Sequence, residues 1–225
     1  MLETLIELDK AIFLIFNSHH TLYFDQVMWV VTGRFIWIPL ILSILYVFFK
    51  KNYKEGLLVV LILAVTVLLC DQIASGLFKP LFERYRPSRD PEFSQYVTLV
   101  NGYLGGRYGF ISSHAANAFG IAIFTIQLFR NKLFSISVIL WAILSCYSRL
   151  YLGVHYPGDI LCGILVGSIT GYLCYKIYEK LHDKIFFQKT IPYRKDKNVN
   201  VIISVLYITY IFILIFAPLI NFKIK

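Results

Sequence analysis

The chain has 225 residues, of which 58% are hydrophobic and only 16% are charged, and its mean hydropathy is +0.66. So few charged residues cannot cover an apolar core of this size, which excludes an ordinary water-soluble domain and makes lipid the solvent for part of the surface. The net charge of +9 is then a sign of orientation in a bilayer and not of a nucleic-acid partner, because basic residues stay on the cytoplasmic side.

Residues 2–17 combine apolar side chains with Glu3, Glu7, Asp9 and Lys10. This segment is too short and too charged to cross a bilayer, and it predicts an amphipathic helix that lies in the membrane interface. The three acidic residues also stand where a signal peptide has basic ones, so no signal peptide is expected.

Apolar stretches about as long as a membrane-spanning helix follow. They lie at about 27–49, 56–78, 110–129, 133–150, 158–179 and 200–221. We therefore expect an all-α fold: a polytopic membrane helix bundle of about six transmembrane helices plus the N-terminal interfacial helix, in a single membrane domain (1–225). The polar segment 79–109 forms a long loop, and 180–199 forms a basic cytoplasmic linker before an additional C-terminal transmembrane helix at 200–221.

The basic residues divide unequally between the two sides that six spans define. One side holds eleven of them: Lys50, Lys51, Lys54, Arg130, Lys132, Lys180, Lys184, Lys189, Arg194, Lys195 and Lys197. Leaving aside three residues that we assign to chemistry below, the other side holds six: Lys10, Arg84, Arg89, Arg107, Lys223 and Lys225. Since cytoplasmic loops carry the excess of Lys and Arg, the 79–109 loop is predicted to face outward. In a bacterium, this means an inner (plasma) membrane protein whose loop lies in the periplasm.

Three polar clusters fall on this outward side. They are Lys79 to Arg86-Pro87, Ser112-Ser113-His114, and Ser148-Arg149 with His155 and Asp159. Charges so near hydrocarbon are costly, and several of them together mark function. The four cysteines, by contrast, lie in apolar stretches without metal-ligand spacing, so we interpret them as small buried hydrophobic groups.

The cations of these clusters predict a phosphate site. Arginine binds phosphate oxygens in pairs and lysine adds a point charge, which suits Lys79, Arg86 and Arg149. Ser112 and Ser113 precede an apolar helical run, where unpaired backbone N–H groups and the helix dipole favour an anion.

The histidines predict phosphoryl transfer. Pro157 suits the first turn of a helix, so Asp159 can turn its carboxylate back toward His155 and fix the tautomer of the ring. The other ring nitrogen of His155 is then free to attack phosphorus. His114, entering from another helix, can protonate the leaving oxygen and later activate water.

This pattern resembles the type 2 phosphatidic acid phosphatase superfamily. The matching residues are Lys79, Arg86, Pro87, Ser112, His114, Ser148, Arg149, His155 and Asp159. The resemblance covers a phosphatase core at about 20–179, with motifs at 79–87, 111–114 and 148–159. It implies His155 as nucleophile, Asp159 as its orienting partner and His114 as general acid. It also implies phosphate binding by Lys79, Arg86, Ser112 and Arg149, and a reaction without metal or cofactor.

Two departures from the family pattern stand out. The second motif is usually Pro-Ser-Gly-His, and here it is Ile111-Ser112-Ser113-His114. The hydroxyl of Ser113 is an additional donor where glycine normally lets the backbone approach phosphate. In addition, the usual first span is reduced to the segment 2–17, and a further span follows at 200–221.

An outward-facing site beside the bilayer predicts a lipid phosphate as substrate. The leading candidates are lipid A and undecaprenyl pyrophosphate, and phosphatidylglycerophosphate and phosphatidic acid are alternatives. Arg84, Arg89 and Arg107 are possible headgroup contacts, or simply a solvated basic loop. Two other functions stay open: a lipid phosphotransferase of the same fold and, more remotely, a noncatalytic lipid transporter. A transporter would favour a repeated half or a broken midplane helix, and neither is evident in the sequence. The sequence leaves the oligomeric state open.

Overall fold

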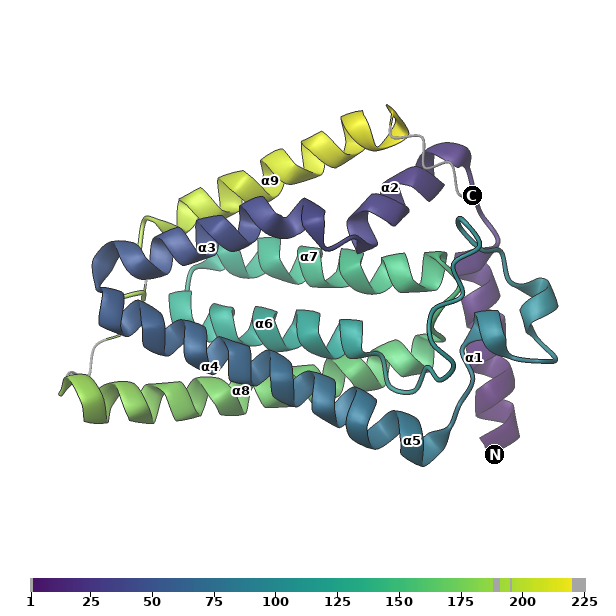
Figure 1. The fold of residues 1–225 in the computed structure, drawn as a ribbon, viewed down its shortest axis with the longest axis horizontal. Helices are drawn as coiled ribbons and strands as arrows, with labels where there is room; N and C mark the ends of the chain where they lie inside the picture. The colour runs from purple at the N-terminus through teal and green to yellow at the C-terminus, as the bar shows by residue number, and fades with distance from the viewer. Residues whose placement is uncertain (1, 188–190, 195, 220–225) are drawn as a thin grey trace.

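The computed structural model describes residues 2–187, 191–194 and 196–219. These residues form helices joined by loops, and within them we find no strand, only an isolated bridge between Tyr85 and Tyr108. The α-helices are α1 (Leu2–Asn17), α2 (Leu22–Thr32), α3 (Ile38–Lys51), α4 (Tyr53–Asp71), α5 (Lys79–Phe82), α6 (Ser113–Phe129), α7 (Lys132–Tyr151), α8 (Pro157–Phe186) and α9 (Val199–Phe216). The expectation of an all-α membrane bundle is confirmed, with α1 lying across one end of the other long helices (Figure 1).

The exact count of six spans is not confirmed. Four helical segments are long and apolar enough to cross a membrane, and a fifth is possible if the bent pair α2 and α3 counts as one span. The α6 helix is apolar but has only 17 residues. Its counterpart α8, expected to end near 179, continues to Phe186.

The stretch at 27–49 is not one straight helix. The α2 helix ends at Thr32, and the chain continues after a 67° bend as a short 3-10 turn, Phe35–Trp37, followed by α3. Gly33 adopts an extended conformation (φ −69°, ψ 148°), and the indole N–H of Trp37 donates to the carbonyl of Val31 at 2.9 Å. A backbone group freed at the break is thus satisfied internally, as a membrane interior requires. Arg34 lies at this break and not within a continuous helix.

The α4 helix continues into α5 through a π-helical segment, Gln72–Phe78. There the amide of Lys79 bonds to the carbonyl of Ala74, five residues earlier. π-Helical turns inside α-helices occur often at functional sites. This one directly precedes the lysine of the first motif.

Small residues bring α6 and α8 into close contact. A Cβ atom added to Gly167 would lie 2.2 Å from the carbonyl oxygen of Ala116, and one added to Gly171 would lie 2.4 Å from that of Gly120. At Gly163 it would lie 2.6 Å from the carbonyl oxygen of Ser112. Small residues four apart allow such close helix packing in membranes. This seam fixes the second motif against the third.

The C-terminal helix α9 packs on the bundle, against α2, α3 and α7. Ile213 and Ala217 join a buried cluster with residues of α2, and the hydroxyl of Tyr207 lies 3.2 Å from that of Ser137 on α7. The last residues of the predicted span, 220 and 221, lie outside the described part of the chain.

Candidate functional site

The three motifs meet at one end of the bundle. Figure 1 shows α5, the following loop, the start of α6 and the end of α7 at the end that α1 crosses. The start of α8 is held there too, because the amide of Ser112 donates to the carbonyl of Asp159 at 3.0 Å. Segments up to 80 residues apart in sequence therefore form one polar site.

His155 and Asp159 form the buried centre of this site. The side chains of both are at most 1% exposed. Asp159 Oδ2 lies 3.3 Å from His155 Nδ1 and accepts a hydrogen bond from the amide of Tyr156 at 3.0 Å. Since a carboxylate accepts, Nδ1 must be the donor, which leaves a lone pair on Nε2.

Arg86 faces that lone pair. Its NH1 lies 3.2 Å from His155 Nε2, and the same group donates to the carbonyl of Val154 at 3.2 Å. Its Nε donates to the carbonyl of Tyr108 at 3.1 Å. An arginine only donates, so this geometry agrees with the tautomer that the carboxylate imposes.

Arg149 projects from the last turn of α7 and is 2% exposed. Its NH1 donates to the hydroxyl of Thr32, and its guanidinium lies 5.6 Å from the ring centre of Tyr103. Its Nε is buried without a hydrogen-bond partner among the described residues. Burying a donor without a hydrogen-bond partner costs free energy. An unsatisfied donor at this position is therefore expected if it binds a ligand.

Lys79 and the second motif lie together. The ammonium of Lys79 donates to the hydroxyls of Ser113 at 2.8 Å and of Ser75 at 3.0 Å. Ser112 is the N-cap of α6, as its sequence position predicts, and accepts from the amide of Ala115. His114 follows and is exposed.

His114 lies close enough to His155, Arg86, Arg149 and Lys79 to feel their charges. The predicted catalytic and phosphate-binding residues are therefore all in one place.

The charges of the site are unbalanced. Within the described residues, Lys79, Arg86 and Arg149 form no ion pair with a carboxylate, although other basic groups do. Burial, then repulsion by Arg86, Arg149 and Lys79, lowers the pKa of His155 well below its ordinary value. Burial, then repulsion by Arg149, lowers the pKa of Arg86 to about 10. His155 is thus neutral and Arg86 is charged at pH 7, a combination that suits an anionic ligand beside a nucleophile.

The three possible headgroup contacts have different surroundings. Arg84 donates to Asp159 Oδ1 at 3.0 Å and to Asp9 Oδ2 at 2.6 Å. Arg89 is exposed and lies with Tyr103 and Gly105 in an open hollow of about 560 Å³. Arg107 is exposed and bonds to the hydroxyl of Tyr85. Arg84 is thus engaged inside the site, while the other two arginines face outward.

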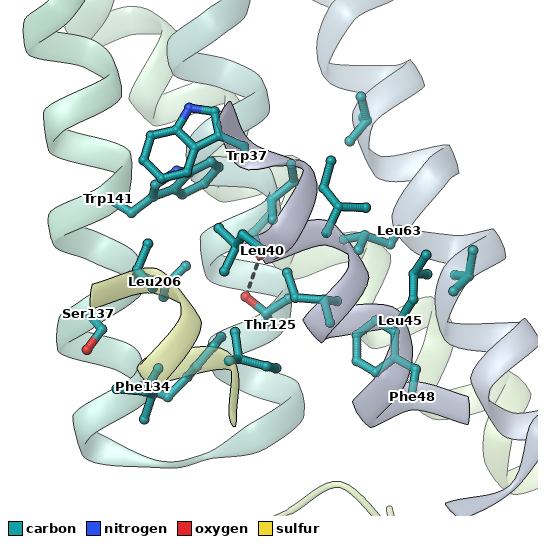
Figure 2. A pocket seen from close by; sticks show the side chains of 18 of the residues that line it. Trp37, Leu40, Leu45, Phe48, Leu63, Thr125, Phe134, Ser137, Trp141 and Leu206 are labelled. Carbon is teal, nitrogen blue, oxygen red and sulfur yellow. Dashed lines mark hydrogen bonds between the residues drawn. The ribbon is translucent and has the colours of Figure 1, made fainter. Parts of the chain in front are cut away.

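A separate apolar cavity of about 480 Å³ lies between the helices (Figure 2). Trp37, Leu40, Phe48, Trp141 and Leu206 are among its lining residues. The cavity contains none of the predicted site residues, and the hydroxyl of Thr125 in its wall is already bonded to backbone carbonyls. It has no group that performs chemistry on a phosphate.

Sequence reasoning missed several residues that hold the site. Asp9 contacts Arg84, Ser75 contacts Lys79, and Thr32 contacts Arg149. The seam of Gly163, Gly167 and Gly171 carries a visible signal, because the glycines are four residues apart. Asp9, Ser75 and Thr32 carry no such signal, since single polar residues in apolar helices look alike before the helices are packed.

Comparison with known proteins identifies the family. The sequence profile of the PAP2 superfamily matches residues 55–183, which is more than half of the chain. The chain belongs to the PAP2 superfamily. The recognition made from the motifs is thereby confirmed, and the chain is a membrane lipid phosphatase of this superfamily.

Individual PAP2 relatives are similar over most of their length. The lipid A 4'-phosphatase of Bacteroides thetaiotaomicron is 42% identical over 195 residues, which cover 85% of this chain and 86% of that protein. The lipid A 4'-phosphatase of Porphyromonas gingivalis is 40% identical over 180 residues, covering 79% and 75%. The crystal structure of the first transmembrane PAP2-type phosphatidylglycerolphosphate phosphatase from Bacillus subtilis has a TM-score of 0.58 at 25% identity, covering 79% and 88%.

Proposed function

We propose that this chain hydrolyses the 4'-phosphate of lipid A at the outer face of a bacterial inner membrane, through a phosphohistidine intermediate. The observation that supports lipid A as the substrate is the 42% identity to a lipid A 4'-phosphatase over 85% of this chain and 86% of that protein. A relationship over 85% of this chain includes the loop 79–109 as well as the motifs.

The first half of the reaction follows from the surroundings of His155. Its Nε2 lone pair attacks phosphorus while Nδ1 donates to Asp159, which stabilises the positive charge that develops on the ring. Arg86, now 3.2 Å from Nε2, turns its N–H groups to the phosphate oxygens. Arg149 and Lys79 neutralise the remaining charge, an electrostatic contribution that is usually large in phosphoryl transfer.

The leaving oxygen and the second half of the reaction are assigned to His114. The charge of the bound phosphate offsets the cations around His114, so that His114 takes a proton from solvent when the substrate binds. It gives this proton to the sugar oxygen as the bond from that oxygen to phosphorus breaks. Water then attacks phosphohistidine, His114 takes its proton, and the bond from Nε2 to phosphorus breaks to release phosphate. The exposure of His114, in contrast to the burial of His155, suits a group that meets both lipid and water.

The orientation rests on the charge distribution. Lys50, Lys51 and Arg130 lie near the ends of α3 and α6 that are remote from the motifs. An excess of basic residues on that side favours the cytoplasm for it and the periplasm for the site. Cysteine labelling in intact cells tests this orientation: a cysteine at the exposed loop position Tyr96 should react with an impermeant reagent, and one at the α6–α7 turn should not.

Phosphate release from a lipid panel tests the substrate. The purified full chain, in detergent with EDTA, is given lipid A, undecaprenyl pyrophosphate, phosphatidylglycerophosphate and phosphatidic acid. We expect release from lipid A with loss of the 4'-phosphate by mass spectrometry, and none from His155→Ala. His19→Ala removes an exposed histidine outside the site and should retain full activity. Preference for another lipid of the panel would contradict the substrate assignment.

The same experiment separates a hydrolase from a phosphotransferase. A hydrolase releases one free phosphate for each lipid consumed, whereas a transferase releases little without an acceptor and labels a second lipid when one is added. Stoichiometric free phosphate without an acceptor is the expected result.

A further inference from the structure

A carboxylate from the N-terminal helix reaches the catalytic pair through one arginine. Asp9 Oδ2 accepts from Arg84 NH2 at 2.6 Å, and Arg84 NH1 donates to Asp159 Oδ1 at 3.0 Å. Asp159 in turn holds His155. The side chains of Asp9, Arg84 and Asp159 are 13%, 25% and 0% exposed. A line of alternating charges therefore runs from α1 to the proposed nucleophile.

Asp9 also binds the helix that carries Asp159. Its Oδ1 accepts a hydrogen bond of 2.7 Å from the amide of Gly158, in the first turn of α8. A Cβ atom at Gly158 would lie 2.8 Å from Asp9 Oδ2, so a residue without a side chain is required for this approach. One carboxylate thus fixes both Arg84 and the helix terminus beside Asp159.

The way in which Asp9 and Asp159 share the charge of Arg84 affects the reaction. Asp159 has to hold the positive charge that forms on His155, but it also faces the permanent charge of Arg84. If Arg84 had no other partner, its attraction would concentrate on Asp159 and compete with His155 for the same carboxylate. Asp9 shares the charge of Arg84, so Asp159 stays available to the histidine. The guanidinium of Arg84 also lies 4.4 Å from the ring centre of Tyr156, which holds it in place.

We propose that Asp9 is a positioning residue for the reaction, and that α1 serves as a part of the active site by setting the charge that Arg84 presents to Asp159. The inference rests on the proposed phosphohistidine chemistry and extends it to a helix outside the family motifs, which begin at Lys79. The groups that face the histidine from the other elements are Arg86, Arg149, Lys79 and His114. Among the described residues, Asp9 bonds to Arg84 and to the amide of Gly158 and to none of these groups. An effect of its charge on His155 is therefore expected to pass through Arg84 and Asp159, and a variant that keeps the bond to Gly158 isolates this route.

The test compares Asp9→Asn with Glu7→Gln in the full chain. The asparagine keeps an acceptor for Gly158 and loses the charge that Arg84 needs. Glu7→Gln removes the same charge from the same helix, but Glu7 is 70% exposed and, among the described residues, pairs with Lys10 alone. We expect Asp9→Asn to lower kcat about tenfold with KM unchanged, a typical coupling between groups of one network. Glu7→Gln should match the wild type.

The pH profile separates positioning from a merely structural role. With Asp9 neutral, the charge of Arg84 is uncompensated and disfavours a proton on His155, so the acidic limb of kcat/KM should move to lower pH. Asp9→Glu, which restores the charge, should restore the wild-type limb. A variant that only folds poorly would lose active protein without moving the limb.

A double-mutant cycle tests whether the effect of Asp9 on Asp159 passes through Arg84. Arg84→Gln alone leaves two carboxylates close together without their cation, and should be the less active single variant. Adding Asp9→Asn to it removes that excess charge and should recover part of the activity. Losses that simply add would contradict a route through Arg84.

Vanadate binding decides the inference independently of the lipid. Orthovanadate forms a five-coordinate adduct with a nucleophile and so mimics the transition state, while inorganic phosphate binds without that bond. By titration calorimetry, Asp9→Asn should weaken vanadate about tenfold and leave phosphate unchanged. Equal vanadate affinity in the variant and the wild type, or no vanadate binding by either, would overturn the inference. If the wild type binds vanadate but does not act on lipid A, the proposed substrate fails and the vanadate comparison still decides the role of Asp9.

Discussion

The partly exposed basic groups at one end of the bundle have carboxylate partners, and the two most buried arginines at the other end have none among the described residues. At the end remote from the motifs, Arg194 pairs with Glu179 at 2.9 Å and Lys51 pairs with Asp196 at 3.0 Å. At the motif end, Arg86 and Arg149 are more deeply buried, and neither pairs with a carboxylate in the described part of the chain. Structural charges are neutralised by the protein itself, whereas charges kept for an anion are left for the ligand to neutralise.

The largest effect is expected from a matched pair of substitutions, one at each end. Arg149→Met removes a cation that waits for phosphate and should lower kcat/KM about 10³-fold, as loss of one transition-state donor does. Its thermal midpoint should be equal or higher, because a buried uncompensated charge is removed. Phosphate release and thermal melting in detergent measure both.

Arg194→Met is the counterpart at the other end. Its loss should lower stability by about 1 kcal/mol or less, since the pair is partly exposed, with specific activity unchanged. If both variants lost activity equally, or if Arg149→Met melted much lower, the contrast between the ends would be wrong.

A smaller effect is expected in the pH dependence. Burial and the nearby cations lower the pKa of His155 well below 6.5. The free enzyme should therefore keep its attacking base, and its kcat/KM, as the pH falls below 6.5. Arg86→Gln should move the acidic limb upward, although with little remaining activity. A wild-type limb at or above pH 6.5 would contradict the effect of these cations.

The lowered pKa of His155 also determines the direction in which the stability of the protein changes with pH. Below pH 6.5 the unfolded chain protonates this histidine and the folded protein does not, so the unfolded state binds more protons. Stability should fall as the pH is lowered from 6.5 toward the folded pKa. His155→Gln should weaken this part of the pH dependence. Thermal melting between about pH 5 and pH 6.5 tests this, in the window of about one and a half pH units below the ordinary pKa of histidine.

The smallest effect is expected at Ser113, where the family usually has glycine. Its hydroxyl accepts from Lys79 at 2.8 Å and lies 2.8 Å from that of Ser75. Ser113→Gly leaves Lys79 bonded to Ser75, so we expect kcat/KM to change by about tenfold or less, within the energy of one such hydrogen bond to a charged group. A change as large as that of Arg149→Met would show that the hydroxyl contacts the reacting phosphate.

Much of the site could be predicted from the sequence because its residues lie at the ends of helices. Once the apolar stretches are located, successive helices cross the membrane in opposite directions, and this brings Lys79, Ser112 and His155 to the same side. The pairing of His155 with Asp159 follows from local helix geometry. Their catalytic roles stay predictions until the variants are measured, and so do the boundaries of the phosphatase core at 20–179.

Other features depended on contacts between distant segments. The sequence left Arg84 as a possible headgroup contact or part of a solvated basic loop, and the structure places it between Asp9 and Asp159. The stretch at 27–49 was expected as one helix, and it bends at Gly33 and Arg34. In both cases the sequence shows a charged residue near apolar ones, and only the packing of distant helices decides where that residue lies.

The sequence by itself determined the membrane bundle, the family and the end of the molecule where chemistry is expected, because hydrophobicity and motif spacing are local properties. The tertiary structure decided the break between α2 and α3, the close α6–α8 seam and the line of charges from Asp9 to His155. Those features depend on the packing of helices from distant parts of the chain, where a few ångströms decide whether a carboxylate reaches an arginine.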